Sequence, residues 1–350
     1  MFLKVRIIGD ILIPSDIFKL GFKNFEEEGC DVMYFDWPVN THDEIQNINL
    51  KIEQHGCEAY EVPNSLLENL IDADIIVTQF CPINKKVIDA CKNLKAIGVT
   101  RGGYENINLE YASEKGILVY NTPGRNANAV ADFTVGVMIC ECRNIARAYA
   151  NLKSGKWIRD YCNFQSVPDL PGKTVGIVGF GQIGRKVAQR LIGFEVEILI
   201  YDPFARELPT YVRSVSLEEL FTKSDFITLH ARLTPETEGM VNKKLLNLMK
   251  KTAYFINTSR SAIVNEKDLV EVLRKERIQG AALDVFDHEP ITKEDPLLSL
   301  PNVTLTPHFA GGTVDCFKNA PKLLASEMIK FISGQSSQFE LNPQIKVRNF

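Results

Sequence analysis

Three side chains in the second half of the chain have the chemistry needed to protonate a carbonyl oxygen. Arg260, Glu289 and His308 follow segments 253–257, 281–285 and 303–306, which the apolar pattern predicts to be buried strands. A guanidinium can hold a carboxylate and polarise a neighbouring carbonyl. An imidazolium can donate a proton near neutral pH, and a carboxylate can raise the pKa of that imidazole. Because ligands of open α/β sheets bind beyond the carboxyl ends of the strands, these side chains are candidates for one catalytic site.

Each of the three side chains also has a simpler interpretation. An arginine after a strand is usually a surface charge, a glutamate before a proline is usually a loop residue, and a single histidine is more often structural. Their order along the chain, behind a dinucleotide motif, favours the catalytic interpretation. His288, directly before Glu289, is a competing proton donor, and we interpret it as a residue at the rim of the site.

A glycine-rich motif of the dinucleotide-binding type precedes these residues. Gly179, Gly181 and Gly184 form GxGxxG between a predicted strand at 174–178 and a predicted helix at 182–192. The first glycine allows a tight turn, the second lets the backbone approach a pyrophosphate, and the third lets helix and strand pack closely. The amides of Gln182 and Ile183, at the positive end of the helix dipole, would bind the phosphates. Alone, this motif is weak evidence, because structural turns often contain such glycines.

A carboxylate after the next predicted strand strengthens the cofactor prediction. Asp202 follows the strand at 195–201, about 20 residues beyond the motif, where a carboxylate can accept hydrogen bonds from the adenosine ribose. It also has a turn-forming role before Pro203. Its charge would repel a 2′-phosphate, so we predict NAD rather than NADP.

The apolar pattern predicts two α/β regions. In the first, predicted strands alternate with helices, and in the second this pattern begins again at residue 174, which indicates parallel sheets covered by helices. The predicted strands before the motif are 4–9, 75–78, 94–99 and 117–120, and a further one lies at 226–229. We predict helices at 15–28, 84–92, 109–115, 127–152 and 313–334, and an irregular tail at 335–350.

The segments that carry these residues resemble the D-2-hydroxyacid dehydrogenase family, which includes phosphoglycerate, glycerate and lactate dehydrogenases. The resemblance runs from about Leu94 to Gly312 and is most specific in NTSR (257–260), LDVFxxEP (283–290) and TPHFAGG (306–312). It implies that Arg260 binds the substrate and polarises its carbonyl, that Glu289 is the acidic partner, and that His308 is the acid/base. It also implies hydride transfer between NAD and a D-configured 2-hydroxy acid.

The resemblance implies further ligand contacts. Candidate cofactor-binding residues are Thr258, Asp284, which would hydrogen-bond the nicotinamide amide, and Gly311, near the nicotinamide ribose. The backbone N–H groups of the loop of Arg101, Gly102 and Gly103 would bind the substrate carboxylate.

The predicted fold is α/β, with two Rossmann-like doubly wound parallel-sheet domains. An NAD-binding domain of residues 122–309 is inserted into a flavodoxin-like substrate domain made of 1–121 and 310–350. The segment at 127–152 and its following loop match the part that builds a homodimer in the family, so we expect a homodimer. The short segment after Gly334 leads us to expect no regulatory domain.

Several positions depart from the family pattern and leave the substrate open. Ser261 stands where glycine is more common, and Arg232 where proline is typical, which places a positive charge toward the cofactor and leaves the preference for NAD over NADP less strict. Arg101, with Arg125 nearby, could recognise a second acidic group such as a phosphate. Alternatively, Arg101 pairs with an internal carboxylate such as Glu105.

Composition narrows the classes of partner. The net charge of −4 argues against nucleic-acid binding, and no apolar run is long enough for a membrane helix. The eight scattered cysteines and five histidines show no zinc spacing, so we expect no metal and reduced thiols in a cytoplasmic protein without a signal peptide. Other functions remain possible on the same fold: an NAD(H)-sensing corepressor, or an enzyme that oxidises formate or phosphite. Glu289 argues against the formate enzymes, which have glutamine there.

Overall fold

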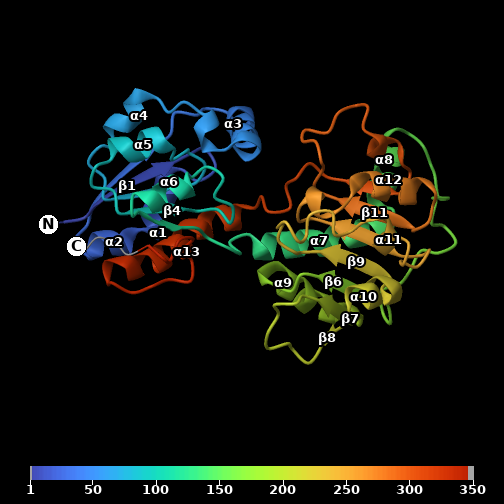
Figure 1. Ribbon diagram of the computed structural model, residues 1–350. Coiled ribbons are helices and arrows are strands. Elements are labelled where there is room, and N and C mark those ends of the chain that lie inside the picture. Colours follow the sequence, from blue (N-terminus) through green and yellow to red (C-terminus); the bar gives the residue numbers. More distant parts are fainter. Residues whose placement is uncertain (1, 346–350) are drawn as a thin grey trace. The chain divides into compact units, whose positions relative to one another are not determined.

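The computed structural model describes residues 2–345, and the chain divides into two units (Figure 1). The first unit consists of Met1–Arg125 and Thr313–Phe350, and the second of Asn126–Gly312. The divisions therefore fall after residues 125 and 312, whereas the sequence analysis placed them after 121 and 309.

The first unit is built on a five-stranded parallel sheet with the order β2-β1-β3-β4-β5. Its strands are β1 (Lys4–Gly9), β2 (Asp31–Asp36), β3 (Ile75–Thr78), β4 (Ala96–Val99) and β5 (Leu118–Tyr120). The central strands β3 and β4 are fully buried apolar runs, as is typical of parallel strands covered on both faces. This is the flavodoxin-like strand order.

Helices cover both faces of this sheet. On one face lie α1 (Ser15–Gly21), α2 (Lys23–Glu27) and α13 (Val314–Ile332). On the other lie α3 (His42–His55), α4 (Asn64–Glu68), α5 (Lys85–Ala90) and α6 (Leu109–Glu114). The helix α13 approaches β4 so closely that a Cβ on Gly98 would lie 2.3 Å from the sulfur of Met328. The predicted helix at 15–28 is two helices, because the backbone leaves the helical conformation at Phe22.

The second unit contains seven parallel strands in the order β12-β11-β10-β9-β6-β7-β8. They are β6 (Thr174–Val178), β7 (Glu197–Tyr201), β8 (Arg213–Ser214), β9 (Phe226–Leu229), β10 (Tyr254–Asn257), β11 (Gly280–Leu283) and β12 (Val303–Leu305). Counted from β6, this is the dinucleotide-binding order 3-2-1-4-5-6 with one more strand. The helices α7 (Ala127–Cys142) and α9 (Gln182–Leu191) pack on one face. The other face is covered by α10 (Leu217–Lys223), α11 (Lys243–Leu246) and α12 (Glu266–Arg274).

The single helix predicted at 127–152 is wrong. The helix α7 ends at Cys142, and α8 (Ile145–Lys153) begins after Asn144, whose φ of 57° is left-handed. Asparagine tolerates this conformation better than most residues. Its side chain also donates to Asn163 at 2.6 Å, which holds the break in place.

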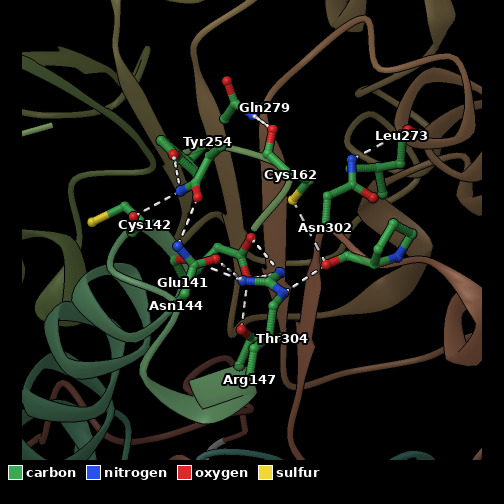
Figure 2. Close-up of polar contacts among 12 residues, drawn as sticks. Glu141, Cys142, Asn144, Arg147, Cys162, Tyr254, Leu273, Gln279, Asn302 and Thr304 are labelled. Carbon is green, nitrogen blue, oxygen red and sulfur yellow. Dashed lines mark hydrogen bonds and ion pairs between the residues drawn. The ribbon is translucent and has the colours of Figure 1, made fainter. Parts of the chain in front are cut away.

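A buried network fixes α8 to the sheet of the second unit (Figure 2). Glu141, at the end of α7, is 2% exposed and accepts two hydrogen bonds of 2.8 Å from Arg147 of α8. Thr304 of β12 donates to the same carboxylate, and Arg147 donates to the carbonyl of Pro301 at 2.6 Å. A buried carboxylate needs such partners, so the position of α8 depends on residues more than 150 positions away.

The end of the chain has no helix or strand over residues 335–345, as predicted, but it is held to β5. Asn342 Oδ1 accepts from the Val119 amide at 2.9 Å, and Glu340 forms an isolated bridge with Tyr120. The remainder of the predicted tail, 346–350, lies outside the described residues. No helix within 2–345 is long and apolar enough to span a membrane.

Candidate active site

The glycine motif forms a tight turn between β6 and α9. Gly179 has a φ of +91°, and a Cβ there would lie 2.4 Å from the Ala231 amide nitrogen, so only glycine fits. A Cβ on Gly184 would lie 2.2 Å from the Gly179 carbonyl oxygen, which shows how closely the helix packs on the turn. At Gly181, in contrast, no atom lies within 4 Å of a Cβ position. Gly181 is also the N-cap of α9 and no side chain caps the helix, so open space faces the free amides of Gln182 and Ile183.

Asp202 lies where the motif requires a carboxylate. It follows β7, and its Oδ2 accepts from the Phe180 amide of the glycine turn at 2.7 Å, while Oδ1 accepts from the Phe204 amide at 2.8 Å. Each carboxylate oxygen can accept a second hydrogen bond. The residue therefore fits both the turn-forming role and a contact with ribose hydroxyls.

His308 and Glu289 lie in direct contact. His308 Nδ1 donates to Glu289 Oε2 at 2.7 Å, and Glu289 Oε1 accepts from the Phe286 amide at 3.0 Å. His308 is left-handed, with a φ of 50°, a conformation that non-glycine residues adopt mainly where the surroundings enforce it. Because Nδ1 is occupied, Nε2 is the nitrogen of His308 that remains for a ligand.

The electrostatics of this pair follow from its hydrogen bond. The bond to Glu289 raises the pKa of His308, although partial burial and the charge of Arg260 oppose the shift. Burial favours the neutral form of Glu289, but the hydrogen bond and charge of His308 outweigh it and lower the pKa of Glu289. The pair therefore favours imidazolium beside carboxylate.

Arg260 is exposed and lies directly after the loop that follows β10. Its Nη1 donates to the Ser259 carbonyl at 2.8 Å, and the Asn257 side chain holds the Arg260 carbonyl at 3.1 Å. Its charge acts on both Glu289 and His308. It forms no ion pair with a carboxylate among the described residues, so the guanidinium is available to an anionic ligand. Ser261, in place of the usual glycine, begins a short 3-10 turn.

Asp284 organises the loop that carries His308. It is almost fully buried after β11, and its oxygens accept from Thr306 Oγ1 at 2.6 Å, the Phe309 amide at 3.2 Å and the Ala310 amide at 3.0 Å. The sequence suggested a cofactor contact. Its protein partners show that it holds residues 306–310.

The other predicted cofactor residues also have protein neighbours. Thr258 is buried and shares a 2.8 Å hydroxyl contact with Thr134 of α7. Gly311 packs against Asn126, whose Nδ2 would lie 2.6 Å from a Cβ.

Arg232 is exposed after β9. His288 is exposed next to Glu289 and forms no hydrogen bond to Glu289 or His308.

In the first unit, the predicted carboxylate-binding loop follows β4. The carbonyls of Arg101 and Gly102 accept from the Thr122 amide at 2.8 Å and from Asn121 Nδ2 at 2.6 Å. Within residues 2–345, the N–H groups of Gly102 and Gly103 donate to no protein atom. The Arg101 side chain is paired, as the internal-carboxylate alternative requires, but its nearest carboxylate is Glu53 at 2.8 Å rather than Glu105 at 3.8 Å.

Asn49 and Glu53, which bind Arg101, were not among the predicted site residues. Both lie on α3, and neither has a motif around it. Their one-turn spacing on a helix is the only signal in the sequence, and it is shared by many surface helices.

Comparison with known proteins assigns the chain to a family. Residues 135–310 match the family described as D-isomer specific 2-hydroxyacid dehydrogenase, NAD binding domain. A glyoxylate reductase of Thermofilum pendens is 36% identical over 331 residues, which cover 92% of this chain and 91% of that one. The chain belongs to the D-isomer specific 2-hydroxyacid dehydrogenase family. The family predicted from the sequence is therefore confirmed.

A further relative and a solved structure extend the comparison. A D-3-phosphoglycerate dehydrogenase of Methanocaldococcus jannaschii is 39% identical over 282 residues, 79% of this chain, and the chain spans only 53% of the length of that relative. The solved structure of an NAD-dependent formate dehydrogenase from Staphylococcus aureus in complex with NAD has a TM-score of 0.68 and 29% identity, with coverage of 96% of this chain and 97% of that chain. The enzyme class of this family is NAD-dependent D-2-hydroxyacid dehydrogenase, and its cofactor is NAD. The predicted fold class and cofactor are confirmed.

Proposed function

We propose that this dehydrogenase interconverts a D-2-hydroxy acid and its 2-oxo acid with His308 as the acid/base, Glu289 as its partner and Arg260 as the substrate-binding cation. The observation that carries the proposal is the 2.7 Å contact between His308 and Glu289, beside an arginine without a carboxylate partner in the described part of the chain. The pair supports a protonated imidazole near neutral pH, which is what the reduction of a carbonyl requires.

The residues of the second unit fit NAD. The open space at Gly181 and the free amides of Gln182 and Ile183 suit the pyrophosphate, and Asp202 suits the adenosine ribose. Thr258, Asp284 and Gly311 complete the proposed set around the nicotinamide. When bound, NAD supplies or accepts the hydride at C2 of the substrate.

Residues of this chain can supply the proton that the reduction requires. In reduction, His308 donates the proton on Nε2 to the oxygen at C2, and the Glu289 carboxylate stabilises the imidazolium before transfer and orients the ring through Nδ1. Arg260 holds the substrate carboxylate and polarises the carbonyl through its guanidinium. In oxidation, neutral His308 accepts the proton instead.

We also propose a carboxylate-binding site in the loop of Arg101, Gly102 and Gly103 in the first unit. The carbonyls of Arg101 and Gly102 are tied to protein donors, whereas the N–H groups of Gly102 and Gly103 have no protein acceptor within residues 2–345. Backbone N–H groups without a protein acceptor favour the binding of an anion. The names of the relatives, glyoxylate reductase and D-3-phosphoglycerate dehydrogenase, suggest small 2-oxo acids with or without a phosphate.

We further propose that the enzyme is a cytoplasmic homodimer that binds no nucleic acid. The helix α8 supports the dimer, because Ile145, Tyr149 and Leu152 are 53%, 67% and 60% exposed at a spacing that places them on one face. The aromatic residues Trp157 and Phe164 in the following loop are also exposed, 81% and 62%.

The proposal is tested by following NADH absorbance with purified enzyme and a panel of glyoxylate, pyruvate, hydroxypyruvate and phosphorylated 2-oxo acids. We expect NADH oxidation by the wild type and a loss of about 10²–10⁴-fold in kcat for His308→Ala, which is the typical contribution of a general acid. NADH binding, measured separately by fluorescence, should be retained. Tight NADH binding without oxidation of any 2-oxo acid would instead indicate a sensing protein, and oxidation of phosphite with NAD⁺ would indicate the phosphite-oxidising alternative.

A further inference from the structure

Arg101 is held on several sides although it lies in a proposed ligand-binding loop. Its side chain is nearly buried, and Nη1 donates to Asn49 Oδ1 at 2.9 Å while Nη2 donates to Glu53 Oε1 at 2.8 Å. The guanidinium carbon lies 4.5 Å from the centre of the Phe80 ring, a cation–π contact. The fork of the guanidinium is therefore directed at α3, and the guanidinium lies over the ring of Phe80, two residues after β3.

A further carboxylate folds back to the same guanidinium. Glu105 Oε2 lies 3.8 Å from Arg101 Nη2. A Cβ on Gly103 would lie 2.4 Å from this carboxylate oxygen, so the absence of a side chain at Gly103 makes room for Glu105. We refer to Asn49, Glu53, Phe80 and Glu105 around Arg101 as the Arg101 clamp.

The backbone of the same loop is also held, through hydrogen bonds from residues after β5. The Arg101 carbonyl accepts from Thr122 beyond β5, and the Gly102 carbonyl accepts from Asn121. The loop is thus fixed through one side chain and two carbonyls, whereas the N–H groups of Gly102 and Gly103 donate to no protein atom within residues 2–345. Fixed, unpaired amides bind an anion without a reorganisation cost at the moment of binding.

The positive charge of Arg101 balances the two carboxylates of the clamp. Glu53 and Glu105 bring two carboxylates toward a loop that is proposed to bind an anionic substrate, and Arg101 is the cation paired with both of them. Without it, two negative charges would face the substrate carboxylate, and like charges at short range oppose binding.

We infer that Arg101 is a positioning residue, which the Arg101 clamp uses to hold the Gly102 and Gly103 amides for the substrate carboxylate, and that its guanidinium does not bind a second acidic group of the substrate. This inference rests on the proposed function, in which these amides bind the carboxylate. With Arg101 in this role, a second acidic group on the substrate has no partner at this position, so Arg101 does not select phosphorylated or dicarboxylic substrates.

The test uses Arg101→Met and Glu53→Gln in the full chain, with Asp72→Asn as the matched control. Asp72 holds the buried Arg6 through two hydrogen bonds of 2.9 and 2.8 Å, beside the amino ends of the strands in the same unit, and so has the same chemistry away from the loop. Hydrogen exchange of the Thr122 amide, which donates to the Arg101 carbonyl at 2.8 Å, is measured first, because it does not depend on activity. We expect faster exchange of this amide in Arg101→Met and Glu53→Gln and no change in Asp72→Asn. Unchanged exchange in the two clamp variants would overturn the inference.

Steady-state kinetics then separate positioning from direct binding. We expect KM in both clamp variants to rise about tenfold for pyruvate and for a 2-oxo diacid alike, as for the loss of a hydrogen bond to a charged group, with kcat within about twofold of the wild type. Arg101→Lys, which keeps the charge but not the fork, should recover part of the loss for both substrates. A rise in KM confined to the diacid or to phosphorylated substrates would identify Arg101 as a direct ligand and overturn the inference. A wild type without 2-oxo acid reduction would refute the proposed function, while the exchange result would still decide whether the clamp holds the loop.

Discussion

At the scale of single residues, the proposed acid/base depends on one hydrogen bond. The backbone of His308 is in the left-handed conformation, and its ring is held through Nδ1 by Glu289. The carboxylate raises the pKa of His308 because it stabilises the charged imidazole more than burial and Arg260 destabilise it. The pH range of the reaction should therefore depend on the charge of Glu289.

Glu289→Gln tests this dependence, because glutamine has a similar shape but no charge. In the wild type, reduction uses the imidazolium, so its rate is highest below the raised pKa of His308 and falls as the pH rises through that pKa. In the variant the pKa of His308 is lower, so we expect the fall in kcat/KM for reduction to begin at lower pH. The rise in kcat/KM for oxidation, which uses neutral His308, should also move to lower pH.

Glu266→Gln is a suitable control for this profile. Glu266 accepts from the Asp287 amide at 3.0 Å and lies near the same loop, but it does not contact His308. Its replacement should leave the profile unchanged. A profile that is identical in wild type and Glu289→Gln would contradict the proposed role of Glu289.

At the scale of elements, the glycines of the β6–α9 turn have different functions. Gly179 and Gly184 are required for packing, because a side chain at either would collide with backbone atoms. A side chain at Gly181 would collide with no such neighbour. The glycine instead leaves open the space in front of the N-terminus of α9. A methyl group at Gly181 should therefore affect the cofactor rather than the fold.

We expect Gly181→Ala to unfold at nearly the wild-type temperature and to weaken NADH binding by about 1–3 kcal/mol, as for an overpacked contact. Fluorescence titration with NADH and a thermal melt measure the two effects. The matched control is Gly193→Ala, which also has no atom within 4 Å of its Cβ position but lies after the end of α9. Equal NADH affinity in Gly181→Ala and wild type would show that this space is not the pyrophosphate site.

At the scale of the whole molecule, the exposed face of α8 is a feature that a single chain does not explain. The buried Glu141–Arg147 network fixes the helix to the sheet (Figure 2), yet no residue of α8 is buried. A rigid helix with an exposed apolar face favours association with another surface. A second copy of the chain is the partner that the family resemblance implies.

Tyr149→Glu together with Leu152→Glu should convert the proposed homodimer to a monomer, because two charges would be placed on the apolar face. Light scattering coupled to gel filtration gives the mass directly. Leu20→Glu, at an apolar residue of the first unit that is 70% exposed, should leave the mass unchanged. A wild type that is monomeric at micromolar concentration would refute the dimer.

Local patterns in the sequence predicted much of the fold. Strands at 75–78, 174–178 and 226–229 are correct to the residue, because short apolar runs between polar turns are typical of parallel strands buried on both faces. The strand β2 was not predicted, since an edge strand alternates exposed and half-buried residues and begins and ends in aspartate. The helix break at Asn144 was missed because the bond that holds it comes from Asn163.

The sequence by itself determined the family, the two-sheet class and the identity of the candidate residues, because each depends on residue types at short, fixed spacings. Only the tertiary structure decided what those residues touch. It paired His308 with Glu289 across 19 positions, directed Asp284 to the 306–310 loop, and gave Arg101 to Asn49 and Glu53 of α3. Contacts of this kind join segments that only the packing of strands and helices brings together, and no spacing along the chain encodes them.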